Sequence, residues 1–120
     1  MKKILLLFIL VTLVGCSSKV DEVVSLKYQN NWYWVLQIKK GATKEDVLQK
    51  VKRWSNPNNT SYFFVYRDTL DLSAFKKKDI TFPYFTDLVI SNIPTYGFYK
   101  MPNDDKIYDD AVWLLEQGKK

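Results

Sequence analysis

Residues 61–67 read Ser-Tyr-Phe-Phe-Val-Tyr-Arg and carry the clearest strand signal in the chain. Aromatic and β-branched side chains fill this run, and they are favoured on the pleated, half-buried surface of a sheet. Directly before it, residues 55–59 read Ser-Asn-Pro-Asn-Asn, where Pro57 cannot continue a helix and the asparagines favour a turn. We therefore predict a strand over 61–67 that follows a tight connection.

The segment before this connection predicts a helix over residues 43–54. Thr43 and Asp46 fit a capping box, in which each side chain binds the backbone amide of the other residue. One face of the predicted helix is apolar and carries Val47, Leu48, Val51 and Trp54. This spacing is typical of an amphipathic helix of about three turns that packs on a sheet.

Further elements are predicted on both sides of this pair. Residues 32–38 are apolar and fit either a strand or a short helix, since periodicity cannot decide so short a run. Residues 69–72 alternate and either extend the strand at 61–67 or pair with it. Pro83 makes residues 80–85 an edge strand or an irregular segment, and residues 87–91 and 96–100 are strand candidates.

A final helix is predicted from Asn103 to Gln117, with acidic residues in its first half and Gly118 as its stop. The order of helix, strands and helix predicts an α+β fold. We expect a small single domain over residues 31–120, with an antiparallel sheet of three to four strands and helices packed on one face.

The start of the chain has the features of an export signal. Lys2 and Lys3 precede a short apolar run that ends in Leu13-Val14-Gly15-Cys16, and this run is too short to span a bilayer. The closing four residues resemble the lipobox of bacterial lipoproteins. The resemblance implies a signal peptide over residues 1–15 and a diacylglycerol on Cys16. Residues 16–30 are then expected to form a lipidated tether to the membrane.

Composition limits the functions open to the mature chain. Without residues 1–15 it has 105 residues, with 16 basic against 13 acidic side chains. A net charge near +3 is too mild to favour nucleic acid, which export also disfavours. The single cysteine is expected to carry the lipid, so no disulfide is expected. Aromatic residues make up 16% of the chain and are expected to supply the core.

The groups that most enzymes use are missing from the sequence. The chain has no histidine, which removes the usual general base and the commonest metal ligand. Asp68 with Asp71, and Asp104 with Asp105 and Asp109, are the remaining carboxylate groups. Aspartates after a strand or at a helix start usually form turns and caps. We expect no catalysis, no metal, no cofactor and no small-molecule substrate.

A second resemblance concerns the domain itself. Gly41, Thr43 and Val47 match the Gly-x-Thr-x-x-x-Val signature that opens a helix in the BamE-like (SmpA/OmlA) lipoproteins. The turn at Pro57 lacks that family's glycine. The resemblance implies an outer-membrane lipoprotein with a helix-helix-three-strand fold that supports β-barrel assembly.

Two features are candidates for partner binding. Lys76, Lys77 and Lys78 form the densest basic run, suited to lipid headgroups or an acidic partner, or simply to a solvated loop. Trp113 is expected to lie off the apolar stripe of the final helix, among acidic and amide side chains. Tryptophan is enriched at binding hot spots, although packing on a neighbouring loop would also account for it.

Together these features predict a non-enzymatic, lipid-anchored envelope protein that acts as a binding or scaffold module for other envelope proteins. Ser17 after the cysteine implies sorting to the outer membrane, facing the periplasm, in a Gram-negative cell. One alternative is an exclusion lipoprotein of a phage or plasmid that blocks an entry channel or receptor. A second alternative is an enzyme inhibitor.

Overall fold

The computed structural model describes residues 19–119, so the signal peptide and Cys16 lie outside the described residues. The described part is one α+β domain. Its elements, in chain order, are β1 (Val20–Tyr28), β2 (Asn31–Ile38), α2 (Lys44–Trp54), β3 (Ser61–Arg67), the 3-10 helix η1 (Ser73–Lys76), α3 (Phe82–Ser91), β4 (Tyr96–Lys100) and α4 (Ala111–Lys119).

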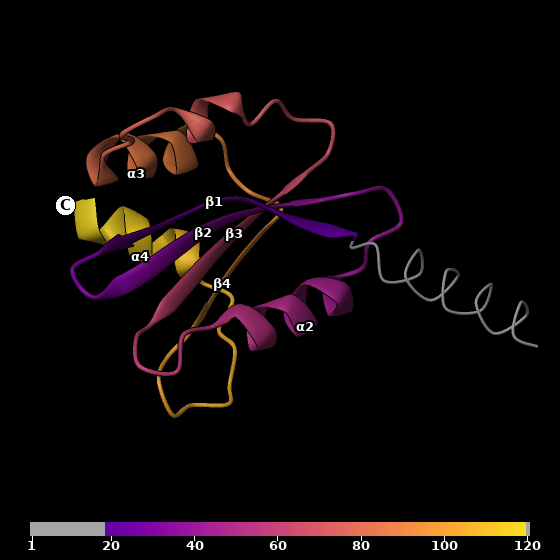
Figure 1. Cartoon of the computed structure of the whole chain (residues 1–120), viewed down its shortest axis with the longest axis vertical. Helices are drawn as coiled ribbons and strands as arrows, with labels where there is room; N and C mark the ends of the chain where they lie inside the picture. The colour runs from indigo at the N-terminus through magenta and orange to yellow at the C-terminus, as the bar shows by residue number, and fades with distance from the viewer. Residues whose placement is uncertain (1–18, 120) are drawn as a thin grey trace, which may run out of the picture.

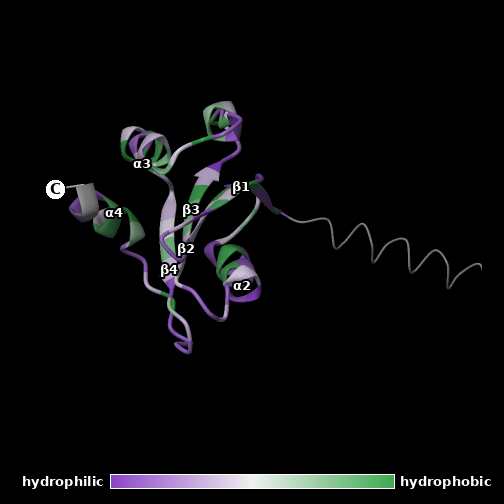
Figure 2. Cartoon of the chain, turned by 60° about the vertical axis from the view of Figure 1, so that its left-hand side comes forward, coloured by the Kyte–Doolittle hydropathy of each residue, from purple (hydrophilic) through white to green (hydrophobic). Residues whose placement is uncertain are grey.

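The four strands form one sheet in the order β1-β2-β3-β4. β1 and β4 run antiparallel to their neighbours, whereas β2 and β3 are parallel and are connected through α2. The predicted α+β class and the strand number are confirmed. The predicted placement of all helices on one face is wrong: α2 covers one face, and α3 and α4 cover the other (Figures 1 and 2).

Helices lie on both faces because most strands bury side chains in both directions. Along β2, Leu36 and Ile38 pack with Val47 and Val51 of α2. The alternate β2 residue Val35 belongs to the opposite cluster, with residues of η1, α3 and α4. A strand buried on both faces needs cover on both sides.

The predicted tether over residues 16–30 is wrong for residues 20–28, which form β1. Residues 20–28 pair with β2 along its whole length, from Val20 opposite Ile38 to Tyr28 opposite Asn31. The ladder is interrupted by a register shift between Glu22 and Val24. A bulge moves later side chains to the other face. The apolar residues of β1 therefore show no continuous alternation in the sequence, although they are part of the core.

The helix and strand that were clearest in the sequence are confirmed. α2 begins after Thr43, whose hydroxyl accepts from the Asp46 amide at 3.2 Å, while the Asp46 carboxylate accepts from the Thr43 amide at 2.8 Å. β3 covers the predicted 61–67, and β4 covers the predicted 96–100.

Two segments with ambiguous patterns are resolved by the structure. Residues 31–38, whose sequence fits either a helix or a strand, form β2. Residues 69–72 neither extend β3 nor pair with it.

α3 replaces the strands or irregular segment predicted over 80–91. Thr81 caps the helix, accepting from the Tyr84 amide at 3.3 Å, and Pro83 lies in the first turn, where proline is tolerated. Phe85 and Val89, four residues apart, are buried on one face. Packing of this face on the sheet outweighs the strand preference of the local residues.

The final helix starts later than predicted. Residues 103–110 form a loop in which Tyr108 pairs with Tyr99 through two backbone hydrogen bonds of 2.9 Å. The Asp104 carboxylate accepts from the Lys106 amide and the Tyr108 hydroxyl, so it stabilises this loop and does not cap a helix. α4 begins at Ala111 and runs past Gly118 to Lys119.

Candidate functional site

A row of tyrosines crosses the sheet on the face that α3 and α4 cover. Tyr33 of β2, Tyr62 of β3 and Tyr99 of β4 are directly opposite one another in the strand register. The rings of Tyr33 and Tyr62 stack at 4.9 Å, and Tyr62 meets Tyr99 at 5.6 Å. Tyr108 continues the row by stacking on Tyr99 at 4.8 Å. Cross-strand aromatic pairs of this kind each stabilise a sheet by about 0.2–1 kcal/mol.

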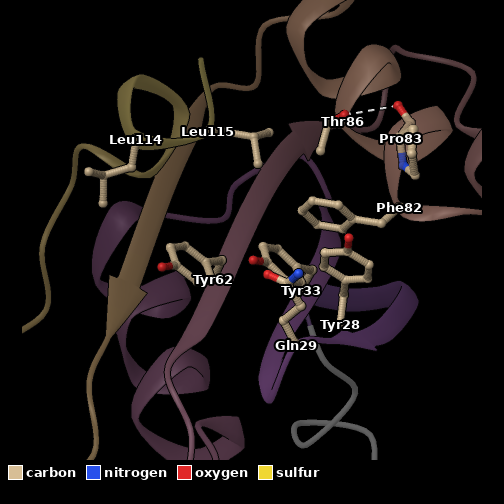
Figure 3. A pocket seen from close by; sticks show the side chains of 9 residues that line it. All are labelled: Tyr28, Gln29, Tyr33, Tyr62, Phe82, Pro83, Thr86, Leu114 and Leu115. Carbon is tan, nitrogen blue, oxygen red and sulfur yellow. Dashed lines mark hydrogen bonds between the residues drawn. The ribbon is translucent and has the colours of Figure 1, made fainter. Parts of the chain in front are cut away.

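One end of this row opens into a cavity between the sheet and the two helices, with a volume of about 490 Å³ (Figure 3). We call it the tyrosine groove. The sheet side contributes residues of β1, β2, β3 and the β1–β2 turn, and α3 and α4 contribute the walls. The lining residues are Tyr28, Gln29, Tyr33, Tyr62, Phe82, Pro83, Thr86, Leu114 and Leu115.

The rim of the groove is formed by the tight turn that joins β1 to β2. Gln29 and Asn30 both have positive φ angles, of 49° and 65°. Two consecutive residues in this region are typical of a type I′ hairpin turn, which favours Asn and Gly. Gln29 is neither, and a side chain in the left-handed region costs about 1 kcal/mol or more. The turn holds the Gln29 side chain at the groove despite this cost.

The groove is polar on its sheet side but carries no charged side chain among its lining residues. Burial raises the pKa of both Tyr33 and Tyr62 above the ordinary tyrosine value. Both phenols are therefore protonated at neutral pH and present neutral hydroxyl groups. Phe82 and the leucines of α4 supply apolar surface opposite them (Figure 3).

Trp113 lies off the buried face of α4, as the spacing predicts. Its side chain is 56% exposed, whereas Ala111 and Leu115 on the same helix are buried. Leu114 and Leu115, which follow it directly, line the tyrosine groove. Trp113 is therefore placed next to the groove along the chain, but it is not one of its lining residues.

The three predicted lysines are exposed and lie elsewhere. Lys76 ends η1, and Lys77 and Lys78 follow it. The Lys77 ammonium lies 4.9 Å from the ring centroid of Tyr84 on α3, a cation–π contact. None of the three lines the tyrosine groove, so the structure does not bring the two predicted binding features into one site.

Two of the carboxylates considered in the sequence, Asp71 and Asp104, hold local backbone amides. Asp71 accepts from the Ser73 amide at 3.0 Å, and this bond lowers the pKa of Asp71. The Lys106 amide is the main cause of the lowered pKa of Asp104. Within residues 19–119, no group of three or more His, Cys, Asp and Glu side chains is placed to hold a metal ion.

The helical spacing predicts the exposed position of Trp113, but the sequence does not reveal the groove. Tyr33 and Tyr62 belong to strands whose mutual register could not be read from the sequence, and Phe82 belongs to an unexpected helix. One local signal was present: a two-residue Gln29-Asn30 break between apolar runs indicates a hairpin.

Within the described part of the chain, no helix has both the length and the apolar character needed to span a membrane. A comparison with protein-family models, curated proteins and solved structures found no match for this chain. The observed element order, which begins with two strands, also differs from the helix-helix-three-strand order implied by the BamE-like resemblance.

Proposed function

We propose that the protein is a non-enzymatic, lipid-anchored envelope protein that binds another envelope protein through the exposed side of α4. The observation that carries this proposal is the 56% exposure of Trp113 on a helix whose other side is held in the core. More than half of this side chain is therefore open to a contact from outside the fold. Large aromatic side chains surrounded by polar groups form the anchors of many protein interfaces.

The position of β1 supports such a role. Val20 lies four residues after Cys16, so a lipid on that cysteine holds the start of β1 within about 14 Å of the membrane. The nine residues of β1 then extend about 30 Å to Tyr28, which lines the groove together with Leu114 of α4. The anchored end and α4 are therefore at different ends of β1, which leaves α4 accessible to a partner in the periplasm.

The surroundings of Trp113 indicate the chemistry of the partner. Asp109 and Asp110, directly before α4, are exposed. Carboxylates at the edge of an interface attract a basic surface and speed association with it. We expect the partner to present an apolar pocket with lysine or arginine residues at its edge.

The test is a pull-down from detergent-solubilised envelopes with the full-length lipoprotein. We expect Trp113→Ala to lower recovery of a specific partner at least fivefold while shifting the melting temperature little. Ile93→Ala is the matched control, because Ile93 is also an apolar side chain and is 62% exposed, in the α3–β4 connection. Equal recovery with the wild type and Trp113→Ala would rule out α4 as the interface. A large drop in melting temperature would show instead that Trp113 stabilises the fold.

A further inference from the structure

We propose that the tyrosine groove is a binding site for a neutral glycan chain that carries acetamido groups. The site is separate from Trp113, and the inference goes beyond the proposed protein partner. It rests on the proposed function in one respect only, the location in the envelope.

The residue types of the groove match both the apolar faces and the polar edge of a sugar ring. A pyranose has apolar C–H faces, which stack on aromatic rings, and hydroxyl groups around its edge, which need hydrogen-bond partners. Phe82 covers one face of the Tyr28 ring at 4.1 Å, and Tyr28 still keeps 39% of its area exposed. The Tyr62 hydroxyl and the Gln29 amide supply donors and acceptors beside it (Figure 3). The Tyr33 hydroxyl, which already pairs with the Asn31 side chain, lines the same groove.

The absence of charge from the lining restricts the class of ligand. Phosphate or carboxylate groups are bound by arginine, lysine or clusters of backbone amides. The nine lining residues include none of the charged types. An anionic saccharide would therefore lose hydration without gaining a counter-charge, whereas a neutral glycan loses only hydroxyl hydration, which the phenols and the amide can replace.

The apolar walls point to the acetamido substituent. Leu114 and Leu115 reach from α4 toward the side of the groove that holds Tyr62 and Tyr33 (Figure 3). A plain hexose carries no methyl group to place against these leucines. An acetamido group presents a methyl to the leucines and an amide that can pair with the Gln29 side chain.

The turn at the rim offers a way to separate binding from stability. Gln29 holds a left-handed conformation, with φ of 49°, that glycine would adopt without strain. Backbone strain of this kind is often found where a side chain has a role in binding. Glycine at this position would relax the turn but remove the amide from the groove, so stability and binding should respond in opposite directions.

The experiment measures binding of chitotetraose and cellotetraose to the full-length protein in detergent micelles, by calorimetry. The two probes share the same linkage and differ by the acetamido groups. We expect chitotetraose to bind at least tenfold more tightly than cellotetraose. Tyr28→Ala should weaken chitotetraose binding about tenfold. Gln29→Gly should also weaken it, with an equal or higher melting temperature.

Tyr84→Ala is the matched control, because Tyr84 is 36% exposed on α3 but does not line the groove, and it should bind like the wild type. Absence of chitotetraose binding, equal affinity for both probes, or binding that survives Tyr28→Ala would each overturn the proposal. So would binding of a neutral leucine-rich peptide in place of chitotetraose. None of these results would affect partner recovery through Trp113, so the two proposals fail separately.

Discussion

Thr43 and Asp46 satisfy each other's backbone amides at the start of α2. Replacing Thr43 with alanine leaves the Asp46 amide without its partner, and loss of an N-cap typically costs about 1 kcal/mol. We therefore expect Thr43→Ala to lower the free energy of unfolding by about 1 kcal/mol in urea titrations, whereas Thr43→Ser should retain most of it. A Thr43→Ala variant as stable as the wild type would show that the cap contributes nothing.

The carboxylate of Asp46 should also make the stability of the fold depend on pH. The Thr43 amide, its strongest partner, lowers the pKa of Asp46 in the folded state. A group whose folded pKa is depressed stabilises the fold above its unfolded pKa of about 3.9, and this contribution is lost as the pH falls through the lower, folded value. The stability gap between wild type and Asp46→Asn should therefore be largest near neutral pH and should close as the pH falls from the unfolded pKa through the lower, folded one. A gap that stays constant across urea titrations from pH 2 to 7 would contradict this.

At the level of elements, β4 and α4 approach closely at Gly97. A Cβ atom on Gly97 would lie 2.9 Å from Val112 Cγ2 and 3.3 Å from the Val112 backbone nitrogen. Gly97→Ala must therefore shift the Val112 side chain and press on the backbone of α4, and overpacking of this kind typically costs about 1–3 kcal/mol. Because α4 forms one wall of the tyrosine groove, we expect lower stability in thermal melts and shifted methyl signals of Leu114 and Leu115. Unchanged methyl signals would show that α4 does not move.

The elements predicted correctly are those whose signal is local. α2 has a cap, an apolar face and a proline after its end, and β3 is rich in aromatic and β-branched residues. β1 is not recognisable in the sequence because its bulge breaks the alternation of apolar residues. α3 is not recognisable because Pro83, which also suits an edge strand, lies in the first turn of a helix. Asp104 was assigned to a helix start, but it stabilises the loop that pairs with Tyr99.

The tyrosine groove could not be predicted for a related reason. Its residues come from the turn after β1, from β2 and β3, and from α3 and α4, so it exists only once the strand register and helix positions are set. Sequence spacing did place Trp113 outside the buried face of α4, because that relation is internal to one helix.

For the molecule as a whole, β1 is an integral part of the folded domain. Val20 belongs to the cluster under α2, and Val24 and Leu26 pack on the opposite cluster, so β1 contributes to both cores. Without β1, the hydrogen-bonding edge of β2 would also be unpaired. We expect a chain that starts at Asn31 to be unfolded or aggregated by circular dichroism and gel filtration. A chain that starts at Lys19 should fold. A folded, monomeric chain from Asn31 would contradict this account.

The central claim is that the protein is held at the membrane by one end and binds a partner through the side of α4 that carries Trp113. The most direct measurement is crosslinking in intact cells, with a photoreactive amino acid at position 113 or at position 49. Gln49 is exposed on α2, on the opposite face of the sheet. We predict a discrete crosslinked product from position 113 and none from position 49. Equal products from both positions, or a product from position 49 alone, would contradict the claim.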